Sequence, residues 1–419
     1  MNTFHSNVKR NFDKIDSILR TLPFESDEYH MLFSIRTYYS FWAERKLFDK
    51  KAFRFYIKSI LKWIILLILF PFSYMKFTKK EDKVILGNWH FDDYLSGMID
   101  IRLLKYKTLF SLYGFVNRLK IIPKIIVFSF KTLTLLDKGK AVVSSPQIFY
   151  FYRALLADVR DIKTIIVEND IYPVNYGILL AAQRNNIVRV KIEYAIIDSV
   201  IHQNCFCDYY FYPTIVHRKI RENCPYNSQL KYIEGGYLNK FNIVNSSYEK
   251  PENMVITYFT EHGDFFEKND LFYIDDILKV LPVNGIINIK IHPYDKIERY
   301  SKYQKNNNIR LYRSTDINNA DLISKSSICL SIFSTMSLES KYICNNSYFI
   351  NYEIGNSPYE YDYSIFNTFF DTINSSKKLY DVLNGKYNPR TIEEFHQNVN
   401  ITFPNTFEIF KTFINNLKE

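Results

Sequence analysis

The sequence predicts an α/β protein with two Rossmann-like domains facing a cleft and an N-terminal helical extension. Apolar runs of strand length alternate with helical stretches from Lys83 to Asn351, a pattern typical of parallel sheets covered by helices. The alternation is interrupted at the polar, proline-containing stretch Asn242–Asn253, where we place the domain junction. A composition of 47% hydrophobic and 23% charged residues excludes wholesale disorder.

Together with the helical extension and the C-terminal tail, the junction gives a chain of four predicted segments. Because the tail from Thr391 onward has a helical pattern, we expect it to pack back on the first domain. The predicted segments are the extension (1–81), the first domain (82–245), the second domain (252–390) and the C-terminal helix (391–419).

The extension is basic, with 15 Lys/Arg against 7 Asp/Glu in residues 1–80, a net +8 of the chain's +10. It contains the uncharged run Trp63–Met75, which has lysines on both sides. As a helix this run would measure about 20 Å, less than a bilayer core of about 30 Å, and Pro71 interrupts it. We therefore expect residues 50–80 to lie on an anionic membrane surface without spanning it, or to form a core helix of the first domain.

In the first domain, a helix from Val174 to Arg184 separates two of the expected strands. The strands themselves are short and apolar. They are Lys83–Asn88, Ala141–Ser144, Thr164–Glu168, Val188–Tyr194, Tyr209–Tyr212 and Tyr232–Gly236.

In the second domain the expected strands are rich in isoleucine, which favours extended structure. The last but one is followed by a helix from Met336 to Ile343. The strands are Met254–Phe259, Ile286–Ile291, Ile309–Tyr312, Ser327–Ile332 and Tyr348–Asn351.

Two polar clusters close strands of the second domain. Lys290, His292 and Pro293 follow one apolar run, and Ser334 and Thr335 follow another about forty residues later. Open α/β sheets bind ligands at the carboxyl ends of their strands, so both clusters are expected at one edge. Together they predict a nucleotide-phosphate pocket.

The chemistry of each residue type supports this interpretation. Hydroxyls and free amides at a helix start bind anions, and Ser334 and Thr335 stand at such a start. His292 is suited to donate to the same phosphate or to deliver a proton to it as it departs, and Glu339 to accept from ribose hydroxyls. The alternative is structural: Ser/Thr as a helix cap and His-Pro as a loop residue pair.

This arrangement resembles the GT-B glycosyltransferases of bacterial surface-polysaccharide assembly, over roughly residues 82 to 390. Three short motifs are similar to those of bacterial sialyltransferases and polysialyltransferases of this type. They are an acidic-acidic-Gly triplet, a His-Pro pair and a Ser/Thr pair, here Glu261-His262-Gly263, His292-Pro293 and Ser334-Thr335.

The resemblance implies that Glu261 is the general base that deprotonates the acceptor hydroxyl. It implies further that His292 contacts or protonates the donor phosphate, which Ser334 and Thr335 hold. His262 departs from the family pattern, which has a second acidic residue there. An ordinary strand-end carboxylate is therefore the alternative for Glu261.

The first domain offers a competing base. Asp92 and Asp93 follow the first strand, in a loop where a carboxylate would face the cleft from the acceptor side, or where it would merely cap the next helix. Asn169 and Asp170 follow the strand Thr164–Glu168 and resemble the family's first domain, so we expect them in the same cleft.

The sequence also predicts the type of reaction. An Asp-x-Asp motif is absent, so we expect no metal and no cofactor, with His292, helix amides and Lys290 neutralising the phosphate. The Glu-x7-Glu pattern usual in retaining GT-B enzymes is absent too, because the eighth residue after Glu339 is Ser347. We therefore expect inversion by direct displacement.

These features together predict an inverting glycosyltransferase. Its favoured donor is a CMP-activated sialic acid or Kdo-like sugar, and its acceptor a lipid-linked lipooligosaccharide, capsule or O-antigen glycan. A polar N-terminus and five scattered cysteines place it in the cytoplasm, on the inner face of the membrane. Nucleic acid is not an expected partner, because no recognisable module interleaves basic and aromatic residues. Alternatives are a CDP-glycerol or CDP-ribitol polyol phosphotransferase, a nucleotide-sugar 2-epimerase and a membrane-bound scaffold.

Overall fold

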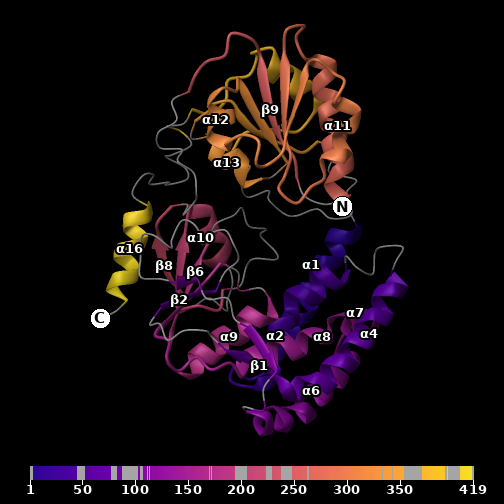
Figure 1. The fold of residues 1–419 in the computed structure, drawn as a ribbon, viewed down its shortest axis with the longest axis vertical. Coiled ribbons are helices and arrows are strands. Elements are labelled where there is room, and N and C mark those ends of the chain that lie inside the picture. The colour runs from indigo at the N-terminus through magenta and orange to yellow at the C-terminus, as the bar shows by residue number, and fades with distance from the viewer. Residues whose placement is uncertain are drawn as a thin grey trace.

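The protein contains two six-stranded parallel sheets, each accompanied by helices. In the view of Figure 1 the second sheet lies above the first, and a helical region lies beside the first. This confirms the predicted α/β class with two Rossmann-like domains and an N-terminal helical extension. The computed structural model describes residues 3–44, 52–76, 83–86, 102–103, 107–110, 112, 114–168, 170, 172–193, 205–222, 229–236, 248–261, 264–332, 334–341, 343–352, 370–391, 394 and 406–417.

The helical region is built around one apolar core, to which Ile15, Leu32, Ile125 and Phe149 contribute. It continues well beyond residue 81, because helices as far as Leu155 pack into the same core. Its helices are α1 (Thr3–Leu19), α2 (Asp27–Thr37), a π-helical turn η1 (Tyr38–Ala43), α4 (Ala52–Leu69), a 3-10 turn η2 (Phe70–Phe72), α6 (Phe115–Leu135), α7 (Lys138–Ser144) and α8 (Pro146–Leu155).

One local expectation in this region was wrong, and the helix expected around Trp63–Met75 has different bounds. Ala141–Ser144 is helical, as part of α7, because Asp137 caps the helix by accepting from the Lys140 amide at 3.1 Å. The run Trp63–Met75 is not a helix of its own. Helix α4 begins earlier and ends at Leu69, just before Pro71, and the last residues form β1 (Ser73–Lys76), which pairs antiparallel with β4 (Lys107–Phe110).

The first parallel sheet has the order β3-β2-β5-β6-β7-β8. The chain starts at β2 and adds β3 on one side, then β5 to β8 on the other, so the strand order reverses between β2 and β5. Helices α9 (Pro173–Arg184) and α10 (Ile215–Glu222) accompany the later strands. The strands are β2 (Lys83–Leu86), β3 (Arg102–Leu103), β5 (Thr164–Val167), β6 (Val188–Ile192), β7 (Tyr209–Tyr212) and β8 (Lys231–Glu234).

The second parallel sheet has the order β11-β10-β9-β12-β13-β14, which reads 3-2-1-4-5-6 along the chain. That is the strand order of dinucleotide-binding folds, with the reversal between β9 and β12. The strands are β9 (Val255–Phe259), β10 (Ile286–Lys290), β11 (Ile309–Tyr312), β12 (Ile328–Ser331), β13 (Ser347–Ile350) and β14 (Thr372–Ile373).

The core of this domain consists largely of isoleucine and tyrosine side chains from the strands and from α11. Figure 1 shows α13, which follows the carboxyl end of β12, on the side of the domain that is nearer to the first. The helices are α11 (Asp264–Val280), the 3-10 helix η5 (Ile297–Tyr303), α12 (Asn319–Ser324), α13 (Thr335–Lys341) and α14 (Ser376–Leu383).

The C-terminal helix α16 (Thr406–Asn416) packs on the first sheet, not on the second. Its buried Phe410 and Ile414 join the core that Ile166 and Phe211 form on one face of that sheet. The ring centroids of Phe211 and Phe410 are 5.1 Å apart in an edge-on arrangement. The chain therefore crosses from the second domain back to the first, as Figure 1 shows for its yellow end.

Candidate active site

Three neighbouring strands of the second sheet end at the same level. Phe259, the last residue of β9, pairs in register with Lys290 at the end of β10 and with Ser331 at the end of β12. The residues that follow, Glu261, His292 and Ser334, therefore leave the sheet at one edge. Adjacent strands lie about 4.8 Å apart, so Glu261 stands between the other two positions. This edge is also the point where the strand order reverses, which is where open α/β sheets bind ligands.

The loops after β9 and β10 are tied to each other. The hydroxyl of Thr260 accepts a hydrogen bond from the His292 amide at 3.0 Å. Thr260 itself is buried. A threonine directly after β9 thus fixes the height at which His292 leaves the sheet, a role that the sequence analysis did not assign to it.

The ring of His292 is oriented by a backbone contact. Its Nδ1 accepts from the Tyr294 amide at 3.2 Å, so the proton of the neutral ring is on Nε2. His292 is half-buried, whereas Tyr294 is exposed. A protonated ring would place its Nδ1–H against the Tyr294 N–H. The geometry therefore favours a neutral Nε2–H hydrogen-bond donor over a residue that delivers a proton.

A buried carboxyl, Asp270 in α11, supports the loop of Glu261 from behind. Its oxygens accept from the Tyr258 hydroxyl at 2.7 Å and from the Glu261 amide at 3.3 Å. The Tyr300 hydroxyl lies 3.3 Å from an Asp270 oxygen and 2.8 Å from an Asp295 oxygen, and its single proton is shared between these two carboxyl groups. Burial raises the pKa of Asp270 well above its ordinary value, and the charge of Glu261 raises it further against the lowering effect of Tyr258.

Asp270 is thus a positioning residue that the sequence analysis missed. An aspartate inside an amphipathic helix is usually exposed to solvent, and nothing local distinguishes Asp270 from its neighbours Asp275 and Asp276. Its role depends on Tyr258 and Tyr300, which come from a strand and from a helix.

Ser334 lies at the start of α13 and caps it. Its hydroxyl accepts from the Met336 amide at 3.4 Å, and its own amide donates to the Ser331 hydroxyl at 3.4 Å. Ser334 therefore has the capping role that was the alternative prediction. Because capping uses only the hydroxyl oxygen as an acceptor, the hydroxyl proton can still act as a donor. Thr335 opens α13, but its side chain is outside the described part. Glu339, one turn further, is buried, with 4% of its surface exposed.

Lys290 ends β10 at this edge, but its ammonium is directed to the turn after β11, contrary to the prediction that it neutralises the phosphate. Its Nζ donates to the carbonyls of Arg313, Ser314 and Ile317 at 2.9, 3.0 and 2.6 Å. An ammonium has three N–H donors, so these contacts use all of them. Burial lowers the pKa of Lys290. The lysine therefore holds the turn after β11. Pro293, beside it in the motif, is exposed.

Asp170 is also not a cleft residue, because only 5% of it is exposed. It belongs to a buried ion cluster of the first domain, 3.3 Å from Lys191 Nζ and 3.9 Å from Arg221. Arg221 also contacts Glu193 at 3.1 Å. Burial raises the pKa of Asp170, but Lys191 and Arg221 outweigh this and lower it overall. The cluster connects β5, β6 and α10, so its role is structural.

Several predicted site residues fall outside the described part of the chain. They are Asp92 and Asp93, the competing bases, together with Asn169, His262 and Gly263. Among the residues that the structure describes, no group of three or more His, Cys, Asp or Glu side chains is placed to hold a metal ion.

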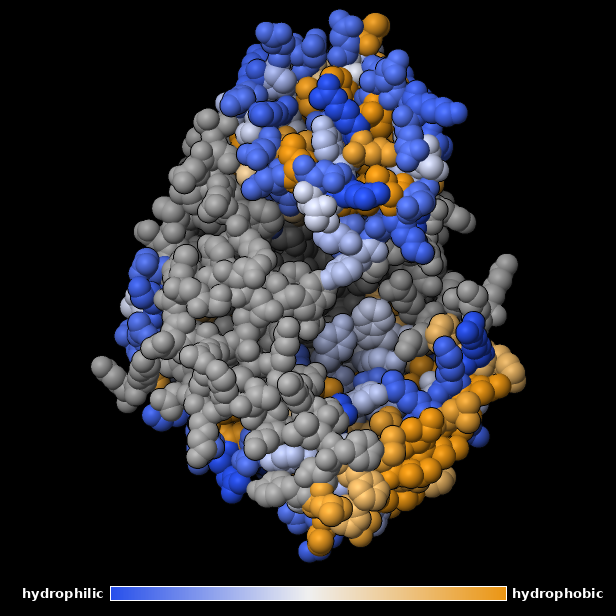
Figure 2. Space-filling view, in the orientation of Figure 1, coloured by the Kyte–Doolittle hydropathy of each residue, from blue (hydrophilic) through white to orange (hydrophobic). Residues whose placement is uncertain are grey.

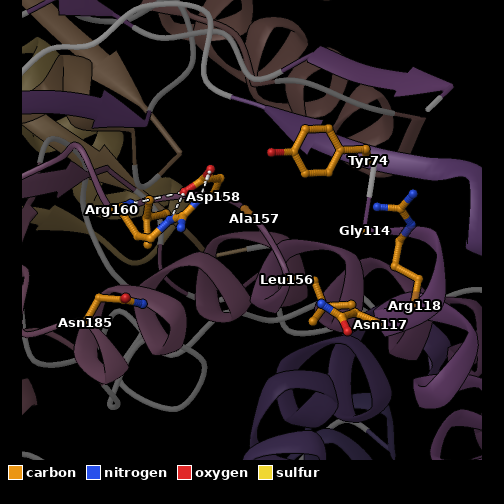
Figure 3. Close-up of a pocket in the computed structure, with 10 residues that line it drawn as sticks. Tyr74, Gly114, Asn117, Arg118, Leu156, Ala157, Asp158, Arg160 and Asn185 are labelled. Atoms are coloured by element: carbon orange, nitrogen blue, oxygen red, sulfur yellow. Dashed lines mark hydrogen bonds and ion pairs between the residues drawn. The ribbon is translucent and has the colours of Figure 1, made fainter. Parts of the chain in front are cut away.

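A separate pocket of about 300 Å³ lies in the first half of the chain (Figure 3). Figure 3 shows Arg160 paired with Asp158 on one side and Tyr74 and Arg118 on the other. The pocket is lined by Ala157–Arg160, which precede β5, and by Asn185, which precedes β6. It therefore lies at the amino ends of these strands and contains none of the predicted site residues.

No protein-family model and no curated protein sequence matches the chain. Solved structures with some likeness include the wall teichoic acid polymerase TagF (11% identity, TM-score 0.44), which covers 88% of this chain and 98% of its own. An S. aureus MnaA structure with UDP has 13% identity and a TM-score of 0.45, covering 80% of this chain and 97% of its own. TarM has 12% identity and a TM-score of 0.40 over 67% of this chain, which spans only 60% of the TarM chain. Likenesses this remote assign neither a family nor an activity.

Proposed function

We propose that the protein is a nucleotide-sugar-dependent glycosyltransferase whose donor phosphate binds at the carboxyl ends of β9, β10 and β12. The observation that carries the proposal is the level ending of these three strands where the strand order reverses. It brings a carboxylate, an imidazole and a hydroxyl, those of Glu261, His292 and Ser334, to one edge. Phosphate recognition needs donors, and acceptor activation needs a base.

Two side chains at this edge can donate hydrogen bonds to the proposed phosphate. His292 would donate from Nε2, because Nδ1 is engaged by the Tyr294 amide. Ser334 would donate from its hydroxyl, whose oxygen accepts from Met336. These are neutral donors, and the ammonium of Lys290 makes its hydrogen bonds to carbonyls of the turn after β11. A leaving group of lower charge, such as a nucleoside monophosphate, suits such a site better than a diphosphate.

Glu261 is the proposed base. Its backbone amide is held by Asp270, which fixes the loop that carries the carboxylate. It extends from the strand between those of His292 and Ser334, one strand spacing from each. Inverting displacement requires the acceptor hydroxyl and the departing phosphate on opposite faces of the sugar ring, so the sugar would lie between the Glu261 carboxylate and the phosphate.

The full proposal is an inverting transferase that needs neither metal nor cofactor. The favoured donor is a CMP-activated sialic acid or Kdo-like sugar, and the acceptor is a lipid-linked or surface glycan of the lipooligosaccharide, capsule or O-antigen kind. The support for a CMP donor is that the two described donors, His292 and Ser334, are neutral and that the Lys290 ammonium binds backbone carbonyls. The sialic acid and acceptor assignments come from the resemblance of the three motifs.

The test is to incubate the purified protein separately with CMP-sugars, CDP-polyols and UDP-sugars, with EDTA present, and to measure the nucleotide released. CMP release from a CMP-sugar is the expected result, and inversion at the anomeric carbon would be followed by NMR of the product. CMP release from a CDP-polyol alone would mean attack at phosphorus, by a polyol phosphotransferase. UDP release from a UDP-sugar alone would remove the CMP assignment.

A further inference from the structure

Two long helices of the N-terminal region present an apolar surface to solvent. We call it the α4–α6 face, and Figure 2 shows it as the orange band at the lower right of the molecule. By length and composition, one stretch of the described residues, Phe53–Phe72, is apolar enough to cross a membrane, yet only 11% of it is buried. A core helix would be mostly buried. The face consists of Phe53, Ile57, Ile60, Leu61, Ile64, Ile65, Ile68, Leu69, Phe72, Val116, Leu119, Val127 and Phe130, which are 37% to 77% exposed.

The two helices are fixed to each other and to the core. The indole Nε1 of Trp63 in α4 donates to the Ser129 hydroxyl in α6 at 3.1 Å. The Trp63 ring also meets Phe149 of α8 edge-on at 5.9 Å. On α6, Ile125 and Ser129 are buried on the opposite side from Val127 and Phe130. Each helix therefore has one side in the core and the other in the α4–α6 face.

The charge of these helices is of one sign. Residues 52–69 and 115–135 contain seven Lys/Arg and no Asp/Glu. Exposed Lys58 and Lys62, one turn apart on α4, border its apolar side, and exposed Lys120 lies on α6. Lys124 and Lys131 of α6 are partly neutralised by Asp27 and Glu28 of α2, at 2.7 and 2.6 Å. Apolar side chains bordered by an excess of cations match the surface of an anionic bilayer, where the acyl chains lie beneath the phosphates.

Helix α4 is poorly suited to cross the bilayer. Its 18 residues extend over about 27 Å, and Lys58 and Lys62 fall near its middle, where a cation in hydrocarbon is costly. Crossing would also separate Trp63 from Ser129 and Phe149. Lying flat, the helix keeps these contacts and places its lysines at the headgroups.

We propose that the α4–α6 face docks the protein on an anionic phospholipid bilayer, with both helices parallel to the surface and their exposed apolar side chains among the upper acyl chains. The proposal adds α6, which sequence patterning did not single out, to the expected contact through residues 50–80. A second copy of the chain is a poorer occupant, because a two-fold interface would oppose the cations of one copy to those of the other.

The test uses the full-length protein and flotation with vesicles of phosphatidylcholine, with and without phosphatidylglycerol. The unmodified protein should float with the phosphatidylglycerol vesicles. The α4 variant Leu61→Gln/Ile65→Gln and the α6 variant Val127→Gln/Phe130→Gln should each lower partitioning by about tenfold or more, because their side chains no longer favour the acyl region. Lys58→Gln and Lys62→Gln should each cost about fivefold, and only when phosphatidylglycerol is present.

The matched control is Val283→Gln/Tyr380→Gln, which replaces two exposed apolar residues of the second domain and should leave flotation unchanged. All variants should keep the thermal midpoint of the unmodified protein, since the replaced side chains are exposed. Carbonate should extract the bound protein, as expected for a surface-bound helix pair.

Three results would overturn the proposal. Resistance to carbonate, with the α6 variant floating normally, would make α4 a membrane-spanning helix. Absence of binding to either vesicle, together with a dimer that the α4 and α6 variants abolish, would assign the face to a second copy. If the protein neither binds vesicles nor forms a dimer, the proposal that the face docks on a bilayer is wrong. None of these measurements involves nucleotide turnover, so they are independent of the proposed function.

Discussion

The contacts of His292 allow its role to be tested by three substitutions that separate its two ring nitrogens. Nδ1 accepts from the Tyr294 amide, which leaves Nε2–H as the donor. Gln places an N–H near the position of Nε2 and does not replace Nδ1. Asn places an oxygen near Nδ1 and does not replace Nε2. Ala replaces neither.

The expected magnitudes follow from these contacts. Losing one preorganised donor to a developing phosphate charge costs about 10²–10³ in kcat, or about 2.7–4 kcal/mol. We therefore expect the kcat of His292→Ala and of His292→Asn to be lower by that factor, and His292→Gln to retain most of the activity. Losing the Tyr294 contact should cost stability no more than about 1 kcal/mol, because Tyr294 is exposed and water can replace the acceptor.

The assay is single-turnover nucleotide release from the donor identified above, with urea unfolding of each variant as a control for folding. If His292→Gln is as inactive as His292→Ala although both bind nucleotide and fold normally, the residue delivers a proton and our interpretation of the ring orientation is wrong. If His292→Ala keeps nearly full activity, the residue belongs to the loop only.

Three further substitutions test the surroundings of the site. Asp270→Ala should lower the free energy of unfolding by about 1–3 kcal/mol, because it leaves the buried Tyr258 hydroxyl unpaired, whereas Asp270→Asn keeps an acceptor. The pKa of Asp270 in the folded protein is raised above its ordinary value of 3.8. The protonated carboxyl therefore contributes fully to the free energy of unfolding below pH 3.8, and this contribution is lost as the pH rises through the folded pKa. The stability of the unmodified protein relative to Asp270→Asn should therefore decrease with rising pH in urea titrations, and an increase would contradict the assignment. Lys290→Met should destabilise by about 1–3 kcal/mol through the orphaned carbonyls but leave nucleotide affinity within about twofold by calorimetry; a large loss of affinity would return Lys290 to the phosphate site. Glu261→Gln should lower kcat by about 10²–10⁴ with unchanged nucleotide affinity, and normal turnover would shift the base to Asp92 or Asp93.

Five of the six strands of the second domain were predictable because each is a compact apolar run, and β10 and β12 fall within the predicted ranges. The two-residue strand β14 was not predicted. Their order in the sheet is a tertiary fact, yet the carboxyl-end rule was enough to place His292 and Ser334 at one edge. What could not be seen is that β9, β10 and β12 end level. That follows from the register of Phe259, Lys290 and Ser331, which are far apart in the chain.

The errors arose where a distant partner decides the structure. Ala141–Ser144 has the composition of a strand, but Asp137 caps a helix there and donates its amide to the Tyr39 hydroxyl at 2.9 Å. Lys290 stands beside His292 in the sequence, and carbonyls 23 to 27 residues downstream bind its ammonium. Asp170 was predicted in the cleft, but in the structure it is buried in ion pairs with Lys191 and Arg221. A single sequence contains no signal for such contacts.

The central claim is that a nucleotide phosphate binds where the strand order of the second sheet reverses. A crystal structure of the protein with bound CMP tests it directly. We predict a phosphate oxygen about 3 Å from His292 Nε2, with another facing the Ser334 hydroxyl. A nucleotide bound instead in the first domain, or in the pocket between Arg118 and Arg160, would contradict the account.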